Sequence, residues 1–334
     1  LIIVLSNLLK ITNYFQSKNF VNLSCYFVIL LPSARFFFKY LSFQPILCFC
    51  FYAFIVHIIK KFLINNEISK PFKDYFSKPL IITLIFISTL VIVSYLYPIA
   101  DGLKDQMRGS DQDDCVILGV NFLSRLKNPY SEYSYFGNPC STGLGMIIIY
   151  FPFVISGFYQ LGTIGSVILS IFSVEIFTKE KYRALIFSLI ILSSLIFLEL
   201  IVVGSDLIFI GSGIVFIVYY LTDLLKTKNI SKLIILSIFT GLIASSRINF
   251  LVLIPLLTLF IFSNWKRGAL LFLIVSTSIA IIPSAFIYFS DPQQFMPLHL
   301  LGKSNLFLKY GLKEFAIFMT ILMILISCKL CFKK

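Results

Sequence analysis

Long apolar runs alternate with short polar connectors along this chain. Examples of runs near the length of a membrane span are residues 79–100, 184–203 and 269–289. A helix needs about 20 mostly apolar residues to cross the hydrocarbon core of a bilayer. A helix also satisfies its own backbone hydrogen bonds, which lipid cannot do. The pattern therefore predicts transmembrane helices at these three runs.

Shorter apolar stretches predict further spans. Residues 20–34 and 42–58 predict one or two spans near the start of the chain, and residues 233–246 and 250–262 predict a pair joined by a turn at 246–249. No stretch has the ten-residue alternation of a transmembrane barrel. We therefore expect an all-α, polytopic bundle of about eight to ten spans.

The basic residues predict the orientation of this bundle. The chain has 28 Lys and Arg against 15 Asp and Glu, a net charge of +13. Their clusters fall in short connectors, and cytoplasmic connectors of membrane proteins are rich in Lys and Arg. The connectors assigned to the cytoplasm are 60–78, 179–183, 226–232, 264–267 and the C-terminal tail. No basic stripe with interleaved aromatic residues is present, so nucleic acid is excluded as a partner.

The remaining polar segments then share the outer face. They are residues 101–142, 204–206 and 290–305, with the turn at 246–249. We divide the chain into N-terminal spans over 1–60, of undefined role, and a transmembrane core over 79–334 with its large outer loop at 101–142. The protein is predicted to lie in the cytoplasmic membrane.

Three of the scarce acids stand together in "GSDQDDCVIL". Ser110 and Asp113 have the spacing of a capping box at a helix start, and acids in a first turn favour the helix dipole. The residues that follow predict an amphipathic helix on the outer membrane surface. A cap uses only one acid, so Asp111 and Asp114 are candidates for chemistry. The predicted apolar face holds Cys115, Val116, Leu118, Phe122, Leu123 and Leu126.

The first outer loop resembles that of GT-C glycosyltransferases, polytopic enzymes that use polyprenyl-phosphate sugars. The shared order is an Asp, an amphipathic helix, an "NPY"-like segment, an aromatic stretch and a proline that opens the next apolar helix. In this chain these are Asp111, residues 128–130, residues 133–136, and Asn138-Pro139, where the family often has two prolines.

The likeness continues downstream and covers about residues 79–305. A polar pair begins a span, a basic connector follows, and a cation precedes an apolar "LVLIPLL" segment. The matching residues are Ser205-Asp206, 226–232, Arg247 and 253–257. Mannosyltransferases, aminoarabinose transferases and protein O-mannosyltransferases all share this layout.

The resemblance implies roles for individual residues. Asp111 would be the general base that deprotonates the acceptor hydroxyl, with Asp114 second. Arg247 would bind the donor phosphate, because a guanidinium pairs with phosphate in a bidentate way, and Lys303 and His299 would approach the same phosphate. Sugar or acceptor contacts would come from Asp206 and Tyr130.

Simpler roles stay open for each of these residues. Arg247 could be a cation that extends from a helix end to water, and Asp206 could cap the next helix. Tyr130 could belong to the interfacial aromatic belt. His299 and Lys303 could be solvated loop residues.

The cysteines offer one candidate bridge. Cys115 and Cys140 lie in the same outer loop and could form a disulfide on an oxidising face. The other cysteines read as packing residues. With only two His and a single "CKLC" pair, no metal site is predicted. No cofactor is assigned, and a divalent metal stays open. The packing cysteines are Cys25, Cys48, Cys50, Cys328 and Cys331.

The expected function is sugar transfer at the outer face, from a polyprenyl-phosphate donor to a glycan, lipid or protein acceptor, with the lipid tail between spans. Two other functions stay open. A transporter or flippase would place charged residues or broken helices near the bilayer midplane. A lipid-linked glycan polymerase or ligase would concentrate Arg in a large outer loop, whereas loop 101–142 begins acidic.

Overall fold

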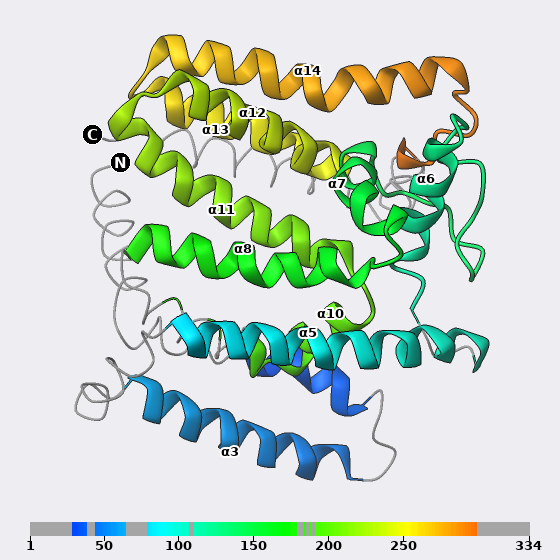
Figure 1. Ribbon diagram of the computed structural model, residues 1–334, viewed down its shortest axis with the longest axis vertical. Coiled ribbons are helices and arrows are strands. Elements are labelled where there is room, and N and C mark those ends of the chain that lie inside the picture. The colour runs from blue at the N-terminus through cyan, green and yellow to red at the C-terminus, as the bar shows by residue number, and fades with distance from the viewer. Residues whose placement is uncertain are drawn as a thin grey trace, which may run out of the picture. The chain divides into compact units, whose positions relative to one another are not determined.

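The computed structural model describes residues 29–38, 44–64, 79–106, 110–178, 184, 188 and 191–298. These residues form helices and connecting loops, with no strand among them (Figure 1). The chain divides into two compact units. The first holds residues 1–85 and 181–200, and the second holds 86–180 and 201–334. The all-α class predicted from the sequence is confirmed.

The first unit contains a break that the apolar pattern did not predict. Its described helices are 29–38, α3 (Pro45–Ile64) and the start of α10 (Leu195–Val202). The run 184–203 was expected to be one span, but its helix is interrupted at residues 193–194. The Ser193 carbonyl at this break accepts a hydrogen bond of 2.8 Å from the Tyr52 hydroxyl. A side chain thus satisfies the interrupted backbone.

The second unit is a set of long helices with short helices at one end (Figure 1). Its most extensive contacts join α12 to α14 and α11 to α8. Its elements are α5 (Pro79–Gly102), which enters the unit at residue 86, η1 (Leu103–Gln106), α6 (Asp114–Ser124), α7 (Leu144–Ile155), α8 (Gln160–Thr178), α11 (Asp206–Thr227), α12 (Ile230–Ser245), η2 (Ile248–Val252), α13 (Leu253–Phe262), α14 (Lys266–Ser290) and η3 (Met296–Leu298).

The described residues contain fewer helices able to cross a membrane than the sequence predicts for the whole chain. Three are long and apolar enough within the described residues: 86–106, α11 and α14. Helices α7 and α8 add a fourth only if they count as one span, and they are bent by 118°. Helices α12 and α13 are apolar but shorter than a span. The expected eight to ten spans are therefore not confirmed.

Several buried hydroxyl groups form hydrogen bonds within their own helix or with the neighbouring helix. Ser170 Oγ meets Ser212 Oγ at 2.8 Å where α8 packs on α11. Ser237 and Thr240 of α12 each donate to the carbonyl four residues earlier, at 2.7 Å. Small hydroxyl residues allow close helix packing in an apolar surrounding. These helices therefore pack closely without leaving these polar atoms unpaired.

The start of α7 lies unusually close to the end of α12. The Gly143 amide donates to the Ser246 carbonyl at 2.7 Å. A Cβ atom on Gly145 would lie 1.9 Å from the Leu242 carbonyl oxygen, so only glycine fits there. This contact fixes the end of the 110–142 loop against the turn that follows α12, and so positions the polar residues of both segments.

Replacing Gly145 with Ala is expected to destabilise the second unit. The added methyl group meets backbone atoms that cannot rotate away, and overpacking of this kind costs about 1–3 kcal/mol. Gly211 of α11 is the matched control, because a Cβ atom there meets nothing within 4 Å. Thermal unfolding in nanodiscs should show a lower midpoint for Gly145→Ala and an equal or higher midpoint for Gly211→Ala. Equal midpoints for both variants would contradict the close approach.

Candidate functional site

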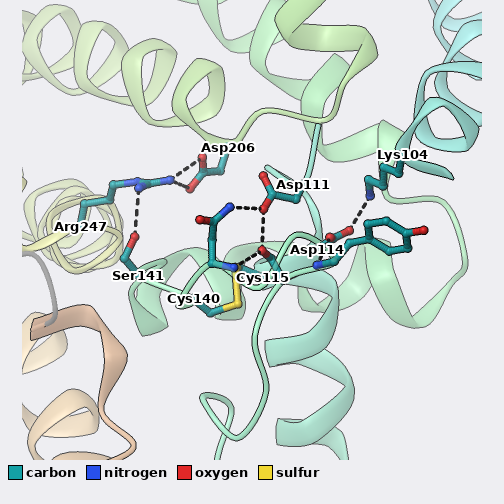
Figure 2. The surroundings of a disulfide bond; sticks show 11 residues. Lys104, Asp111, Asp114, Cys115, Cys140, Ser141, Asp206 and Arg247 are labelled. Carbon is teal, nitrogen blue, oxygen red and sulfur yellow. Dashed lines mark hydrogen bonds and ion pairs between the residues drawn. A yellow bond between two sulfur atoms is a disulfide. The ribbon is translucent and has the colours of Figure 1, made fainter. Parts of the chain in front are cut away.

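Three polar segments meet at one end of the second unit. The loop 110–142, the start of α11 and the turn after α12 were each predicted to reach the outer face, and the contacts between them place them together (Figure 2). The site is built from two ion clusters and a loop that joins them. We call the cluster around Arg247 the arginine pair and the cluster around Lys104 the lysine cluster.

The arginine pair joins the turn after α12 to the first residue of α11. Arg247 Nη2 donates to both carboxylate oxygens of Asp206, at 3.0 and 2.9 Å. Nη1 reaches the Ser141 hydroxyl at 3.5 Å. Asp206 is fully buried, whereas the Arg247 side chain is 25% exposed. The predicted phosphate-binding cation is thus partly accessible and already neutralised by a carboxylate.

Asp111 is oriented from one side only. Its Oδ2 accepts hydrogen bonds from the Ser134 hydroxyl and, at 2.8 Å, from Asn138 Nδ2. No side chain in the described part of the chain donates to its Oδ1. Partial burial raises the pKa of Asp111. These two hydrogen bonds, a backbone hydrogen bond and the charge of Lys104 together outweigh burial, so the pKa lies below its ordinary value. Asp111 is therefore a fixed, ionised carboxylate with one oxygen open.

The loop segment 138–141 connects Asp111 to the arginine pair. Asn138 binds Asp111 and Ser141 contacts Arg247, three residues further along. An extended chain covers at most 3.6 Å per residue, so the Cα atoms of Asn138 and Ser141 lie within roughly 11 Å. A carboxylate and a guanidinium from distant parts of the sequence are thereby held by four consecutive residues.

A disulfide ties this segment to the start of α6. Cys115 and Cys140 are bonded, with their Cα atoms 5.1 Å apart (Figure 2). These are the two cysteines that the sequence placed in the same outer loop. Because Cys140 lies between Asn138 and Ser141, the bond restricts the residues that contact Asp111 and Arg247.

The lysine cluster is a closed group of charges. Lys104 Nζ lies 2.5 Å from Asp101, 3.1 Å from Asp113 and 2.5 Å from Asp114. The Tyr97 hydroxyl donates to the other oxygen of Asp113. Burial raises the pKa of Asp113 above its ordinary value, although Tyr97 and Lys104 both oppose this effect. The cluster supplies the counter-charge that this buried carboxylate needs.

The residues of the lysine cluster do not fit a divalent metal as they stand. Carboxylate oxygens of Asp101, Asp113 and Asp114 lie within 4.8 Å of one another, as metal ligands would. However, the Lys104 ammonium already contacts all three, and a cation beside it would be repelled. The acids are arranged around an amine. These residues therefore give no support to the divalent metal that the sequence left open.

The structure corrects the role predicted for Asp113 and shows what already binds Asp114. Helix α6 begins at Asp114 with Asp113 at the N-cap, and the Asp113 side chain makes no cap bond. The Ser110 hydroxyl accepts from the Gln112 amide at 3.4 Å, before the helix begins. The Asp113 side chain points instead to Lys104 and Tyr97, because a buried carboxylate gains more from charge than from a cap. Asp114, predicted as a second catalytic acid, is bound by Lys104 and by the Tyr135 amide at 2.9 Å.

The buried face of α6 also differs from the predicted one. Val116, Gly119 and Val120 are buried, whereas Leu126 lies beyond the end of the helix and is 96% exposed. The predicted face included Leu126 because the apolar spacing continues past residue 124. The helix ends there, and Leu126 has a positive φ of 56°.

Tyr130 is not placed to contact a sugar. Its ring is 1% exposed and packs edge to face against Phe295, with centroids 5.2 Å apart. A buried ring presents no face for stacking, so the predicted sugar contact is not supported. Asp206 is equally inaccessible. His299 and Lys303, predicted to approach the phosphate, lie outside the described residues.

An apolar pocket of about 320 Å³ opens beside the turn that carries Arg247. It is lined by α14, η3, the end of α12 and the segment that follows, including Ser245 and Ile248, which lie on either side of Arg247 in the sequence. Gly143, two residues after Ser141, also lines it. Exposed apolar residues such as Ile281 and Phe289 form part of its wall, so the pocket suits a hydrocarbon chain.

No protein family, curated protein or solved structure matches the chain. The function is therefore inferred from the residues of the site. The sequence pointed to Asp111 and Arg247 but missed Lys104, Tyr97 and Ser134. The sequence offered one signal for Lys104, which stands beside Asp101 and Asp105 in a segment that also holds Asp111, Asp113 and Asp114.

Replacing Lys104 with Gln is expected to destabilise the protein. Removing one partner of a buried ion pair costs about 3–5 kcal/mol, because the remaining charge is left uncompensated. The pKa of Asp113 is higher in the folded protein than in the unfolded chain. Its ionisation therefore lowers the stability of the folded state once the pH exceeds the unfolded pKa, and protonation at lower pH restores that stability. The loss of thermal stability should therefore be larger at neutral pH than near pH 5. Lys127→Gln, at an exposed position, is the control.

Removing the disulfide is expected to loosen the loop. A Cys115→Ser/Cys140→Ser variant should lose about 2–4 kcal/mol of stability, because the unfolded chain gains freedom. Hydrogen exchange should increase at residues 134–141, which the bond restricts. In the parent protein, alkylation under denaturing conditions should modify two more cysteines after reduction than before. The same count before and after reduction would show that the bond does not form.

Proposed function

We propose that this protein is a membrane glycosyltransferase of GT-C type. It transfers a sugar from a polyprenyl-phosphate donor to the hydroxyl group of a glycan, lipid or protein acceptor. One observation carries the proposal: an ionised carboxylate with an open oxygen, a partly exposed guanidinium and an apolar pocket lie at the same end of a helical unit. These are the groups that an acceptor, a phosphate and a lipid chain require.

The pocket and Arg247 suit the two parts of the donor. A polyprenyl phosphate joins a hydrocarbon chain to an anion, and the hydrocarbon is favoured wherever apolar surface leaves water. Ser245 and Ile248 line the pocket on either side of Arg247 along the chain. A lipid chain in the pocket therefore has its phosphate near a guanidinium, which can bind two phosphate oxygens at once.

Asp111 suits the acceptor side of the reaction. The bond between the sugar and the phosphate oxygen breaks through an oxocarbenium-like state while the acceptor oxygen attacks. The acceptor proton passes to the open oxygen of Asp111, and the electrons of the broken bond stay on the phosphate. The lowered pKa makes Asp111 a weak base, so it takes the proton late, when the acceptor oxygen is already positive. Arg247 stabilises the charge that develops on the phosphate.

The placement of the site favours the outer face of the cytoplasmic membrane. The connectors rich in Lys and Arg are typical of the cytoplasmic side, and the site belongs to the opposite set of loops. Cys115 and Cys140 form a disulfide, and disulfides persist mainly in oxidising compartments outside the cytoplasm. The finer topology of the spans is part of the proposal.

A transporter or flippase is the second candidate. The bent pair α7 and α8 favours a transporter, since broken helices form the binding sites of many transporters. Such sites lie near the bilayer midplane, whereas the ion clusters described above gather at one end of the unit. A flippase would move the intact lipid-linked sugar, and an enzyme would cleave it.

The Asp111→Asn variant is expected to lose sugar transfer. The amide keeps the shape of the side chain but cannot accept the proton, and loss of a general base typically lowers the rate by about 10²–10⁴-fold. The measurement is transfer from radiolabelled polyprenyl-phosphate sugars in membranes. Asp223→Asn is the control, because Asp223 is an exposed acid near the other end of α11.

Full transfer activity in Asp111→Asn would remove the base role. Movement of uncleaved donor across the membrane, with no free polyprenyl phosphate formed, would favour the flippase. Solvent extraction separates the product, the free polyprenyl phosphate and the remaining donor.

A further inference from the structure

Asp206 occupies a position that suits a bound anion. Its carboxylate is fully buried at the first turn of α11, a helix of 22 residues, and Arg247 binds both of its oxygens. The N-terminus of a helix carries partial positive charge, which favours an anion. Arg247 and the N-terminus of α11 therefore form an anion-binding site, and the Asp206 carboxylate is the anion that occupies it.

Donors beside this carboxylate have no partner in the described part of the chain. Ser205 is the N-cap of α11 and is fully buried, yet its hydroxyl makes no capping bond. Arg247 Nε is buried and unpartnered as well. Buried polar atoms are nearly always paired in folded proteins, so an unpaired group at such a site points to a missing partner.

A third unpartnered group lies against the same turn. The Tyr150 hydroxyl is buried without a partner among the described residues. Its ring packs edge to face against Phe209, one turn into α11, with centroids 5.7 Å apart. The start of α11 therefore has more hydrogen-bond donors than Asp206 uses.

We propose that Asp206 is a resident anion that stands in for the phosphate of the donor and is exchanged for it on binding. The proposal rests on the function proposed above and makes Asp206 a positioning residue for Arg247. In the resting state the carboxylate holds the guanidinium in place and neutralises it. When the donor binds, the phosphate oxygens replace Asp206 at the Arg247 guanidinium and also accept from its unpartnered Nε–H, and the Ser205 hydroxyl donates to the released carboxylate.

The exchange explains why the phosphate-binding cation is already paired. An unpaired guanidinium beside apolar helices would be costly, whereas one with an internal counter-ion is stable before the donor arrives. The donor phosphate is a diester with one negative charge and two unesterified oxygens, so it can bind the guanidinium in the same bidentate way as the carboxylate that it replaces. It displaces Asp206 because its lipid chain holds it nearby at a high effective concentration. An anion without a lipid chain is too dilute to do so.

Anion rescue tests the exchange without an activity assay. Asp206→Ala removes the resident carboxylate, and inorganic phosphate should then fill the place that it leaves. In nanodiscs, millimolar phosphate is expected to raise the thermal midpoint of Asp206→Ala by several degrees relative to sodium chloride of equal ionic strength. The parent protein and the Asp206→Ala/Arg247→Gln variant should show no such difference. Asp223→Ala is the surface control.

A second measurement covers the case in which Asp206→Ala does not fold. Asp206→Asn keeps the shape of the side chain and removes its charge, so Arg247 is released for a ligand. Farnesyl phosphate should bind this variant about tenfold more tightly than the parent, and farnesol should bind both equally. Equal or weaker farnesyl phosphate binding in Asp206→Asn, or no phosphate-specific rescue in a folded Asp206→Ala, overturns the proposal.

The two proposals can fail separately. Phosphate rescue together with an absence of sugar transfer would keep the anion exchange and remove the glycosyltransferase. Sugar transfer that depends on Asp111, without any rescue or gain in affinity, would keep the enzyme and make Asp206 a structural ion-pair partner only.

Discussion

A carboxylate buried at the end of an apolar bundle has to find a cation, and the site of this protein is organised around two such carboxylates. Asp113 and Asp206 are both almost fully removed from solvent. Each forms an ion pair with a cation from another segment: Asp113 with Lys104, and Asp206 with Arg247. These pairings hold η1, the 110–142 loop, α11 and the turn after α12 in contact. The remaining polar contacts depend on that arrangement.

The two clusters differ in a way that matters for function. Lys104 contacts three carboxylates and is buried, so its charge is more than compensated. Arg247 has one carboxylate, keeps a quarter of its side chain exposed and retains an unpartnered Nε. A closed cluster of the first kind stabilises the fold, whereas an incompletely paired guanidinium can still accept an anion. This contrast supports a structural role for Lys104 and the proposed binding role for Arg247.

Backbone contacts transmit this order to the loop. Gly204 has a positive φ of 71°, and a Cβ atom there would lie 3.0 Å from Asp113 Cβ and 2.8 Å from the Tyr159 ring. The Tyr159 hydroxyl donates to the Gly204 carbonyl at 2.7 Å. The lysine cluster is therefore packed directly against the residues that precede Asp206. With the disulfide at Cys140, these contacts leave the 110–142 loop little freedom to move independently of α11.

The sequence by itself determined the helical class, the apolar character of the long helices and the gathering of Asp111, Asp206 and Arg247 at one end. These features follow from local composition and from the alternation of apolar runs with polar turns. It also named Cys115 and Cys140 of one loop as a candidate disulfide, and the structure joins them.

Only the tertiary structure decided which acid does what. Asp113 resembled a helix cap, yet it is the buried partner of Lys104, and Tyr130 resembled a surface aromatic residue, yet its ring lies in the core. The break at residues 193–194 and the bend between α7 and α8 likewise divide apolar stretches that composition alone reads as continuous. The physical reason is the same in each case. The periodicity of apolar residues reflects the preferences of residues that are close in the sequence. Burial and charge pairing depend on residues far apart in the sequence, such as Asp206 and Arg247, which meet only when the chain has folded.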